Sequence, residues 1–107
     1  ELLFMIENID KKQFKELLNN SDNSPIFVDF YAEWCSPCKS FERILLEAEK
    51  KISDVAKIYR VDIDKEPELA ERFAVMSVPT LILFKDKAQH RTLIGVRSLD
   101  EVIDMLG

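Results

Sequence analysis

Apolar residues recur at intervals of three and four positions in four segments of the chain, the spacing that places them on one face of a helix. Asp10 and Ser98 are residue types that cap helix N-termini, and Pro67 suits the first turn of a helix. The apolar faces of the four predicted helices are Phe14, Leu17 and Leu18; Phe41, Ile44, Leu45, Ala48 and Ile52; Leu69, Ala70 and Phe73; and Leu99, Val102, Ile103 and Leu106.

Five other segments read as strands: residues 2–6, 26–31, 59–64, 80–84 and 88–96. The second of these is apolar at every position except Asp29, which is typical of a strand in the middle of a sheet. In the third, apolar and charged residues alternate, which predicts a strand with one polar face. The acidic residues from Asp62 to Glu68 alternate with other types and are interrupted by Lys65, which favours a solvated edge over a cation site.

The predicted order of elements is β-α-β-α-β-α-β-β-α. Alternation of strands and helices favours parallel pairing, with helices on both faces of the sheet. The last two strands are separated only by Asp86 and Lys87, so an antiparallel hairpin is expected there. The predicted class is therefore α/β, with a central five-stranded mixed sheet flanked by four helices. A length of 107 residues suits one domain spanning residues 1–107.

Composition narrows the functional classes. The chain has 15 Lys and Arg against 20 Asp and Glu, and this net charge of −5 argues against nucleic acid or an acidic membrane surface as a partner. The apolar run at residues 2–6 is too short for a secretory signal, and no run approaches the roughly 20 residues of a membrane span. Two cysteines and one histidine are too few for a zinc site of the Cys/His kind within one chain, so no bound metal is expected.

The two cysteines carry the clearest chemistry. Cys35 and Cys38 are three residues apart, directly after the predicted central strand and at the start of a predicted helix. Residues i and i+3 share a helix face, with Cβ atoms about 5–6 Å apart, so a modest adjustment allows a disulfide. Such a short loop adds little stability, which suits a bond that opens and closes. Unpaired N–H groups and a partial positive charge at a helix N-terminus favour a thiolate at Cys35, which leaves Cys38 as the resolving thiol.

A Cys-X-X-Cys pair in this setting is typical of thioredoxin-like redox proteins. Residues 28–39, Val-Asp-Phe-Tyr-Ala-Glu-Trp-Cys-Ser-Pro-Cys-Lys, strongly resemble the active-site segment of the thioredoxin family. Val78-Pro79-Thr80 resembles the second signature of that family, and Phe84-Lys85 and Gly95 fit its later strands. The resemblance extends over nearly the whole chain in order and spacing. It implies the thioredoxin fold and thiol–disulfide exchange.

The resemblance also implies roles for individual residues. Cys35 would attack a client disulfide, and Cys38 would then attack Cys35 to release the client. Asp29 matches the buried carboxylate of the family; burial should raise its pKa so that it exchanges a proton with Cys38, and a purely structural hydrogen bond is the alternative. Pro79 is expected to be cis, against the general preference of X-Pro bonds for trans. The expected client-docking surface consists of Trp34, Ser77, Val78, Pro79, Gly95 and Val96.

Positions close to the cysteines are expected to tune the redox couple. Ser36 and Pro37 separate the cysteines, and Ser36 stands where thioredoxins mostly have glycine. A hydrogen bond from its hydroxyl to the Cys35 thiolate would make the couple roughly 20 mV more oxidising. Tyr31 replaces a common tryptophan and brings a hydroxyl near Asp29. Arg60 replaces a common lysine, and because arginine stays charged it is expected to hold Asp29 more firmly ionised.

Two further residues have less specific signals. Met76 precedes the second signature, where packing is the favoured interpretation and a client contact the alternative. His90, the only histidine, lies in a predicted edge strand without obvious partners and is expected on the solvated surface.

The first functional hypothesis is a protein-disulfide reductase that contributes to electron transport and cell redox homeostasis. It needs no bound cofactor: NADPH would supply electrons through a thioredoxin reductase, and the partners would be that reductase and disulfide-containing clients. The protein would act as a monomer in the reducing cytoplasm. One alternative is a disulfide oxidase or isomerase with the same chemistry. Others are a binding module without turnover, or a dimer sharing a metal or iron–sulfur cluster through two cysteine pairs.

Overall fold

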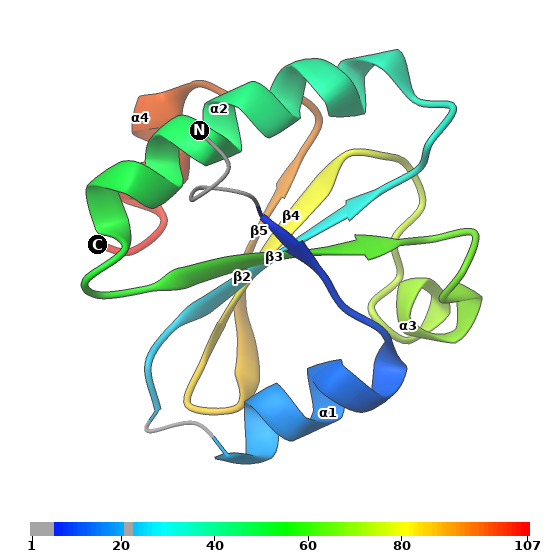
Figure 1. Cartoon of the computed structure of the whole chain (residues 1–107), viewed down its shortest axis with the longest axis horizontal. Coiled ribbons are helices and arrows are strands. Elements are labelled where there is room, and N and C mark those ends of the chain that lie inside the picture. Colours follow the sequence, from blue (N-terminus) through cyan, green and yellow to red (C-terminus); the bar gives the residue numbers. More distant parts are fainter. Residues whose placement is uncertain (1–5, 21–22) are drawn as a thin grey trace.

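A computed structural model describes residues 6–20 and 23–107 (Figure 1). A five-stranded sheet, with strand order β1-β3-β2-β4-β5, runs through the molecule. The elements in chain order are β1 (Glu7–Asn8), α1 (Lys11–Asn20), β2 (Ile26–Tyr31), α2 (Ser36–Ile52), β3 (Lys57–Asp62), α3 (Pro67–Arg72), β4 (Thr80–Lys85), β5 (Ala88–Ile94) and α4 (Leu99–Asp104). The predicted order, the mixed sheet and the four helices are confirmed.

Strand pairing follows the expected pattern only in part. β3 pairs in parallel with both β1 and β2, and β4 and β5 form the expected antiparallel hairpin. β4 also pairs antiparallel with β2, where the alternation of strands and helices predicted a parallel pair. All six residues of β2 are buried, in agreement with its predicted central position. The first strand differs from the prediction: β1 is Glu7–Asn8, and residues 2–5 of the predicted strand lie outside the described residues. Among the described residues, no helix is both long and apolar enough to cross a membrane.

Helices cover both faces of the sheet. In Figure 1, α2 and α4 lie on one side and α1 on the other. Under α2 and α4, the core includes Phe27 of β2, Ile58 of β3 and Leu81 of β4. On the opposite face, the core includes Val28 and Phe30 of β2. Residues of β2 therefore alternate between two separate cores, as the two-residue repeat of a strand requires.

The core on the α1 face contains an aromatic cluster. Phe14 of α1 packs edge-to-face against Phe73 and Phe84, with ring centroids 5.5 Å and 5.2 Å apart. Phe73 and Phe84 also meet edge-to-face at 5.1 Å, and the Phe30 ring is tilted against Phe73 at 6.3 Å. Such geometries are those that aromatic pairs favour.

Helix ends and turns are formed by local side-chain chemistry. The N–H of Gln13 donates to Asp10 Oδ1, and Gln13 Oε1 accepts from the N–H of Asp10, so the predicted cap at Asp10 is confirmed. Ser98 and Glu101 form the same reciprocal arrangement, a capping box, before α4. The β4–β5 turn places Asp86 and Lys87 at φ 51° and 67°, the left-handed conformation that tight hairpins require at both central positions.

The polar face of β3 is not a solvated surface. Arg60 and Asp62 are only 7% and 5% exposed, and Arg60 lies against α2, with its Nη1 3.2 Å from Glu42 Oε2. The Asp62 side chain instead closes the turn after β3, where its Oδ1 accepts from the N–H of Asp64 at 2.9 Å. The expectation of a solvated edge from Asp62 onward is therefore wrong for Asp62, whereas Glu68 is exposed.

Candidate active site

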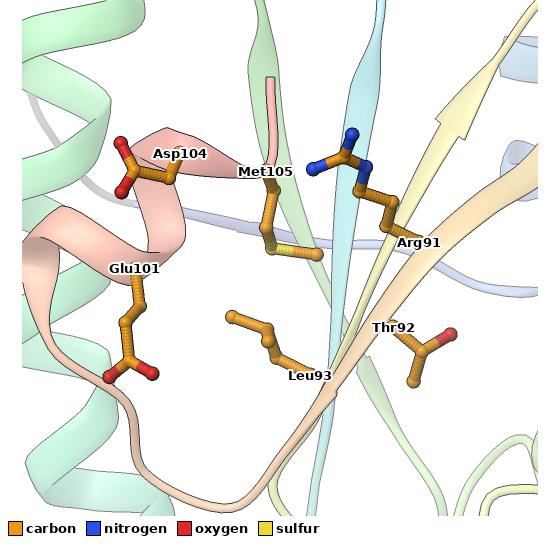
Figure 2. Close-up of a pocket in the computed structure, with 6 residues that line it drawn as sticks. All are labelled: Arg91, Thr92, Leu93, Glu101, Asp104 and Met105. Carbon is orange, nitrogen blue, oxygen red and sulfur yellow. The ribbon is translucent and has the colours of Figure 1, made fainter. Parts of the chain in front are cut away.

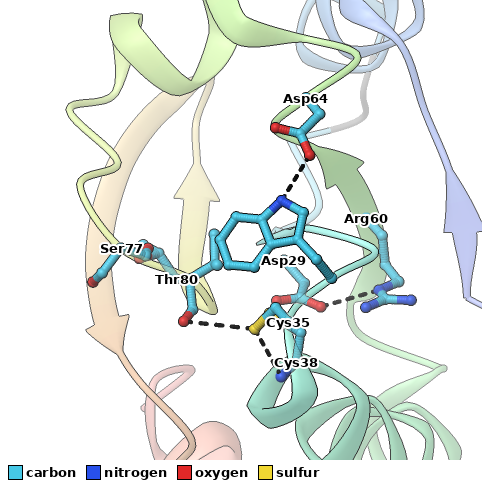
Figure 3. The surroundings of a disulfide bond; sticks show 9 residues. Asp29, Cys35, Cys38, Arg60, Asp64, Ser77 and Thr80 are labelled. Atoms are coloured by element: carbon cyan, nitrogen blue, oxygen red, sulfur yellow. Dashed lines mark hydrogen bonds and ion pairs between the residues drawn. A yellow bond between two sulfur atoms is a disulfide. The ribbon is translucent and has the colours of Figure 1, made fainter.

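A disulfide joins Cys35 and Cys38 at the N-terminus of α2, with Cα atoms 5.3 Å apart (Figure 3). Cys35 is the N-cap residue of the helix, and its Sγ accepts a hydrogen bond from the N–H of Cys38 at 3.1 Å. Pro37 occupies the first turn, where its missing N–H leaves no helix bond unmade. The helix therefore directs an N–H group and the positive end of its dipole at Cys35, a setting that stabilises a thiolate once the disulfide is reduced.

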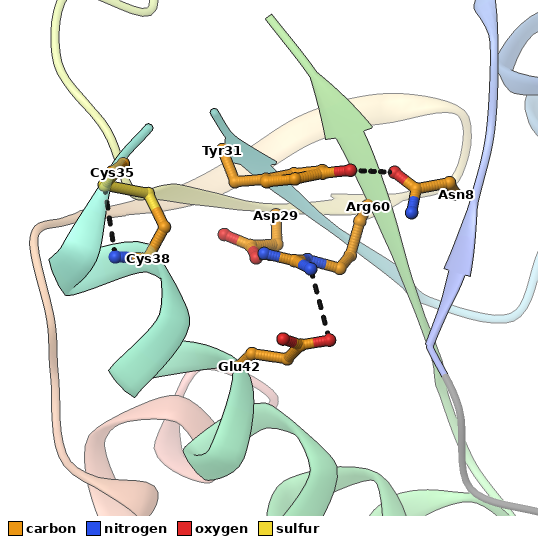
Figure 4. Close-up of polar contacts among 7 residues, drawn as sticks. All are labelled: Asn8, Asp29, Tyr31, Cys35, Cys38, Glu42 and Arg60. Carbon is orange, nitrogen blue, oxygen red and sulfur yellow. Dashed lines mark hydrogen bonds and ion pairs between the residues drawn. A yellow bond between two sulfur atoms is a disulfide. The ribbon is translucent and has the colours of Figure 1, made fainter. Parts of the chain in front are cut away.

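Asp29 lies beneath this disulfide, on the same face of the sheet. It is fully buried, and its Oδ2 accepts from Arg60 Nε at 3.1 Å, across the β2–β3 register that pairs the two residues. Figures 3 and 4 show the carboxyl between the disulfide and the guanidinium. Oδ1 has no hydrogen-bond partner within the described part of the chain, and Figure 3, where a dashed line marks the bond from Arg60 to the other oxygen, places it on the disulfide side.

Burial dominates the acidity of this carboxyl. Desolvation raises the pKa of Asp29 from 3.8 to about 6, although the nearby Arg60 charge and its hydrogen bond act in the opposite direction. Arg60 thus favours ionised Asp29, as expected from its charge, but it does not offset burial. A carboxyl with a pKa close to neutrality can both accept and return a proton under ordinary conditions.

Arg60 is held on several sides (Figure 4). Its Nη1 lies 3.2 Å from Glu42 Oε2 on α2, and its guanidinium carbon lies 3.6 Å from the centre of the Tyr31 ring. The Tyr31 hydroxyl donates to Asn8 Oδ1 of β1 at 2.6 Å. The ring therefore stacks on Arg60, and the hydroxyl binds Asn8, a partner that the sequence interpretation did not name.

Two loops bring the second signature to the cysteines. The Val78–Pro79 peptide bond is cis, as the resemblance implied, and the Val78 carbonyl oxygen lies 3.8 Å from Cys35 Sγ. Thr80 Oγ1 donates to the Ser77 carbonyl at 2.7 Å and so fixes the start of β4. The N–H of Gly95 donates to the Pro79 carbonyl at 2.8 Å. Gly95 has φ +86°, a conformation that favours glycine even though a Cβ there would meet no other atom within 4 Å.

Exposed apolar side chains surround these loops. Trp34 is 69% exposed, and its indole Nε1 donates to Asp64 Oδ2 at 2.9 Å. Val96 is also exposed, whereas Val78 is half-buried and Pro79 is buried. The sequence interpretation missed Ile94, which is exposed beside Gly95, and it misjudged Met76, whose 93% exposure excludes a packing role. Glu42 was missed as well, because its helical position carries no motif.

Other parts of the molecule bring together fewer reactive side chains. A pocket of about 380 Å³ lies between β5 and α4 (Figure 2). It is lined by Arg91, Thr92, Leu93, Glu101, Asp104 and Met105. His90 is exposed on β5, in agreement with its predicted surface position. Within residues 6–20 and 23–107, no three His, Cys, Asp or Glu side chains converge as metal ligands would.

The fold and the cysteine pair together define a thiol–disulfide oxidoreductase, and comparisons with known proteins agree. The sequence model of the thioredoxin family matches residues 5–107. Thioredoxin from Rickettsia bellii is 35% identical over 102 residues, which cover 95% of this chain and 96% of that protein. Chloroplastic thioredoxin Y2 from Arabidopsis thaliana is 44% identical over 93 residues, covering 87% of this chain and 55% of its own length.

Solved structures give the same answer. The crystal structure of Deadhead, a germline-specific thioredoxin of Drosophila melanogaster, superimposes with a TM-score of 0.84 at 28% identity, covering 95% of this chain and 96% of the other. Thioredoxin from Fasciola hepatica also reaches a TM-score of 0.84, at 27% identity and over 92% and 97% of the two chains. This chain belongs to the thioredoxin family.

Proposed function

We propose that the chain reduces disulfides of client proteins, with Cys35 as the nucleophile and Cys38 as the resolving thiol. The observation that carries this assignment is the position of Cys35 Sγ, which caps α2 and accepts a hydrogen bond from the N–H of Cys38. The accessibility of the two cysteines supports it, because Cys35 is 4% exposed and Cys38 is fully buried. An incoming disulfide therefore meets Cys35 first.

The reaction proceeds in two exchanges. The Cys35 thiolate attacks one client sulfur, the client S–S bond breaks, and the first client thiolate leaves and takes up a proton. Cys38 then gives its proton to Asp29 and attacks Cys35 Sγ, so that the Cys35–Cys38 disulfide forms and the second client thiolate leaves and is protonated. Two electrons pass from the cysteine pair to the client.

Client docking is assigned to the surface around Cys35. The exposed side chains of Trp34 and Val96 supply apolar contact area, and Ile94 and Met76 extend it. The backbone of Ser77 and Val78 lies beside Cys35, where it can pair with an extended client segment. The N–H of Gly95 donates to the Pro79 carbonyl and so joins the loop that contains Pro79 to the residue after β5.

The proposed function also implies an electron donor and a cellular compartment. Membership of the family supports a thioredoxin reductase as the electron donor, with NADPH as the source of electrons and no prosthetic group on this chain. We assign the protein to a reducing compartment such as the cytoplasm, because a cysteine pair that must be reduced again after each turnover suits such surroundings.

Two measurements test the proposed function. Cys38→Ala should accumulate a mixed disulfide with a peptide that contains one disulfide, while the matched variant Cys35→Ala should form none; mass spectrometry of the adduct reads both. An adduct through Cys38 in Cys35→Ala would reverse the assigned roles. Equilibration against graded dithiol and disulfide buffers then gives the reduction potential. A value below the cytosolic glutathione poise supports the reductase, whereas a value typical of oxidising compartments supports an oxidase or isomerase.

A further inference from the structure

The position and orientation of the Arg60 guanidinium are fixed by more contacts than a single ion pair. Its Nε binds Asp29 Oδ2 at 3.1 Å, and its Nη1 binds Glu42 Oε2 at 3.2 Å. One planar face lies on the Tyr31 ring, which Asn8 holds in turn through the tyrosine hydroxyl. Two edge contacts and one face contact fix both the position and the orientation of a planar cation.

This constraint has a consequence for the two carboxyl oxygens of Asp29. Because Oδ2 is occupied by Arg60 Nε, the carboxyl is held in one orientation, and Oδ1 is left without a partner among the described residues. Oδ1, the carboxyl oxygen that is not joined to Arg60 in Figure 3, lies on the disulfide side. A buried carboxyl oxygen without a hydrogen-bond donor is a strong proton acceptor.

We propose that Arg60 is a positioning residue that confines proton exchange by Asp29 to Oδ1, and that Glu42 tunes this exchange from the edge of the site through its contact with Arg60. The proposal rests on the proposed acid–base role of Asp29. The step it concerns is the transfer of the Cys38 S–H proton to Oδ1 as Cys38 attacks Cys35, with the proton returned when the pair is next reduced.

The surroundings of Asp29 identify Glu42 as the group to vary. Within the described part of the chain, the charged group of β3 that acts on Asp29 is Arg60, and that of α2 is Glu42, in addition to the thiol of Cys38 when reduced. From β4 the residue paired with Asp29 is the apolar Leu81. The negative charge of Glu42 raises the pKa of Asp29, and the same carboxylate is the second ion-pair partner of Arg60.

A pocket beside this network gives it access to solvent. The pocket has a volume of about 280 Å³, and Cys38, Glu42, Arg60 and Tyr31 all line it. Its rim also carries Glu33 and Lys39, both exposed, so their charges are closer to water than that of Arg60. The side chain of Glu42 is 41% exposed, so a change there leaves the core intact while it alters the partner of Arg60.

The test compares Glu42→Gln with Glu47→Gln, the same charge change at an exposed position of the same helix. Glutamine can still accept from Arg60 Nη1, so the guanidinium stays in place but no longer shares its charge. The pKa of Asp29, followed through its side-chain carboxyl signal by NMR in the reduced protein, should fall by roughly 0.2–0.7 in Glu42→Gln, the size expected of a partly exposed ion pair. The pH at which mixed-disulfide resolution accelerates should fall by the same amount. Glu47→Gln should change neither.

Asp29→Asn separates this inference from the proposed function. If resolution loses its pH dependence in Asp29→Asn but Glu42→Gln behaves like Glu47→Gln, the role of Glu42 is overturned and the acid–base role of Asp29 stands. If Asp29→Asn leaves the pH dependence of resolution unchanged, the acid–base role fails and the inference about proton exchange fails with it. Arg60→Lys adds a third arm. The lysine ammonium is a point charge that cannot contact both carboxyls and also stack on Tyr31, so Glu42→Gln should change the pKa of Asp29 less in this background. An equal change of the pKa in both backgrounds would show that Glu42 does not act through Arg60.

Discussion

The two faces of the sheet serve different purposes although the same strands build both. On the α1 face, Val28 and Phe30 of β2 enter a hydrophobic core that contains the phenylalanine cluster. On the α2 face, Phe27 begins an equally apolar core, but Asp29 and Tyr31, two and four positions further along, meet Arg60 and the cysteines. One face of β2 therefore contributes only apolar packing. The other face contributes apolar packing at its start and the groups near the cysteines at its end.

This difference shows that the residues near the cysteines lower the free energy of unfolding, whereas the apolar residues of the other face raise it. The α1 face gains free energy from every side chain it buries. On the α2 face, Asp29 is fully buried, and desolvation raises its pKa and disfavours its ionised form. We therefore expect mutations on the first face to change stability alone, and mutations on the second to change stability and reactivity together.

The largest expected effect is on the apolar face. Phe14→Ala should lower the free energy of unfolding by about 3–5 kcal/mol, because it removes a fully buried ring from two edge-to-face contacts. Urea denaturation measures the loss. The reduction potential of the variant, measured where it is still folded, should equal that of the parent. A changed potential would show that the two faces are coupled. Phe14→Leu serves as the matched control, with a smaller loss and the same potential.

The next largest effect has the opposite sign and lies on the reactive face. The pKa of Asp29 is raised from 3.8 to about 6 on folding, so the folded state binds more protons than the unfolded state between these values, and stability falls as pH rises through that window. Above it, the loss of stability is about 3 kcal/mol, since a pKa difference of one between the two states corresponds to about 1.4 kcal/mol. Asp29→Asn, which resembles the protonated carboxyl, should therefore raise the free energy of unfolding by up to about 3 kcal/mol at pH 7.

The pH dependence of the stability gained in Asp29→Asn shows whether ionisation of Asp29 is its cause. Well below pH 3.8, Asp29 is protonated in both the folded and the unfolded states of the parent, so the advantage of Asp29→Asn should shrink towards zero. Chemical denaturation at about pH 3 and about pH 7 measures it. A gain that is equal at both pH values would mean that side-chain polarity, and not ionisation, sets the stability of this face.

The same contrast explains what could be predicted from the sequence. The order of elements, the central position of β2 and the caps at Asp10 and Ser98 follow from local pattern, which reports on each segment by itself. The cis bond at Pro79 came only from resemblance, because local preference points the other way.

What the sequence interpretation missed depends on tertiary packing. The burial of Arg60 depends on its packing against α2, and the Asp62 side chain closes the turn after β3; an alternating pattern reveals neither contact. Glu42 is an ordinary surface residue in the helical pattern until Arg60 is placed beneath it. The exposure of Met76 likewise follows from the path of the loop before β4, not from its residue type.

A smaller effect concerns the tether between the reactive face and β1. Tyr31→Phe keeps the ring against Arg60 but removes the 2.6 Å hydrogen bond to Asn8. We expect a loss of about 1 kcal/mol in the free energy of unfolding, the usual net value of one such bond. Thermal and urea denaturation measure it, with Tyr59→Phe on the opposite side of β3 as the control. If the rate of thiol–disulfide exchange also changes, the Tyr31–Asn8 hydrogen bond orients Arg60 and does not merely stabilise the strand.

The smallest expected effect is on the redox couple itself and involves a residue outside both cores. Ser36 is exposed in the first turn of α2, between the two cysteines. A hydrogen bond from its hydroxyl to the Cys35 thiolate would stabilise the reduced protein, and because water competes at an exposed site the difference should be at most roughly 20 mV. Ser36→Gly should lower the reduction potential by up to that amount, and Ser36→Thr, which keeps the hydroxyl, should not. Equal potentials in Ser36→Gly and the parent would leave the helix N–H groups and Asp29 as the groups that set the potential.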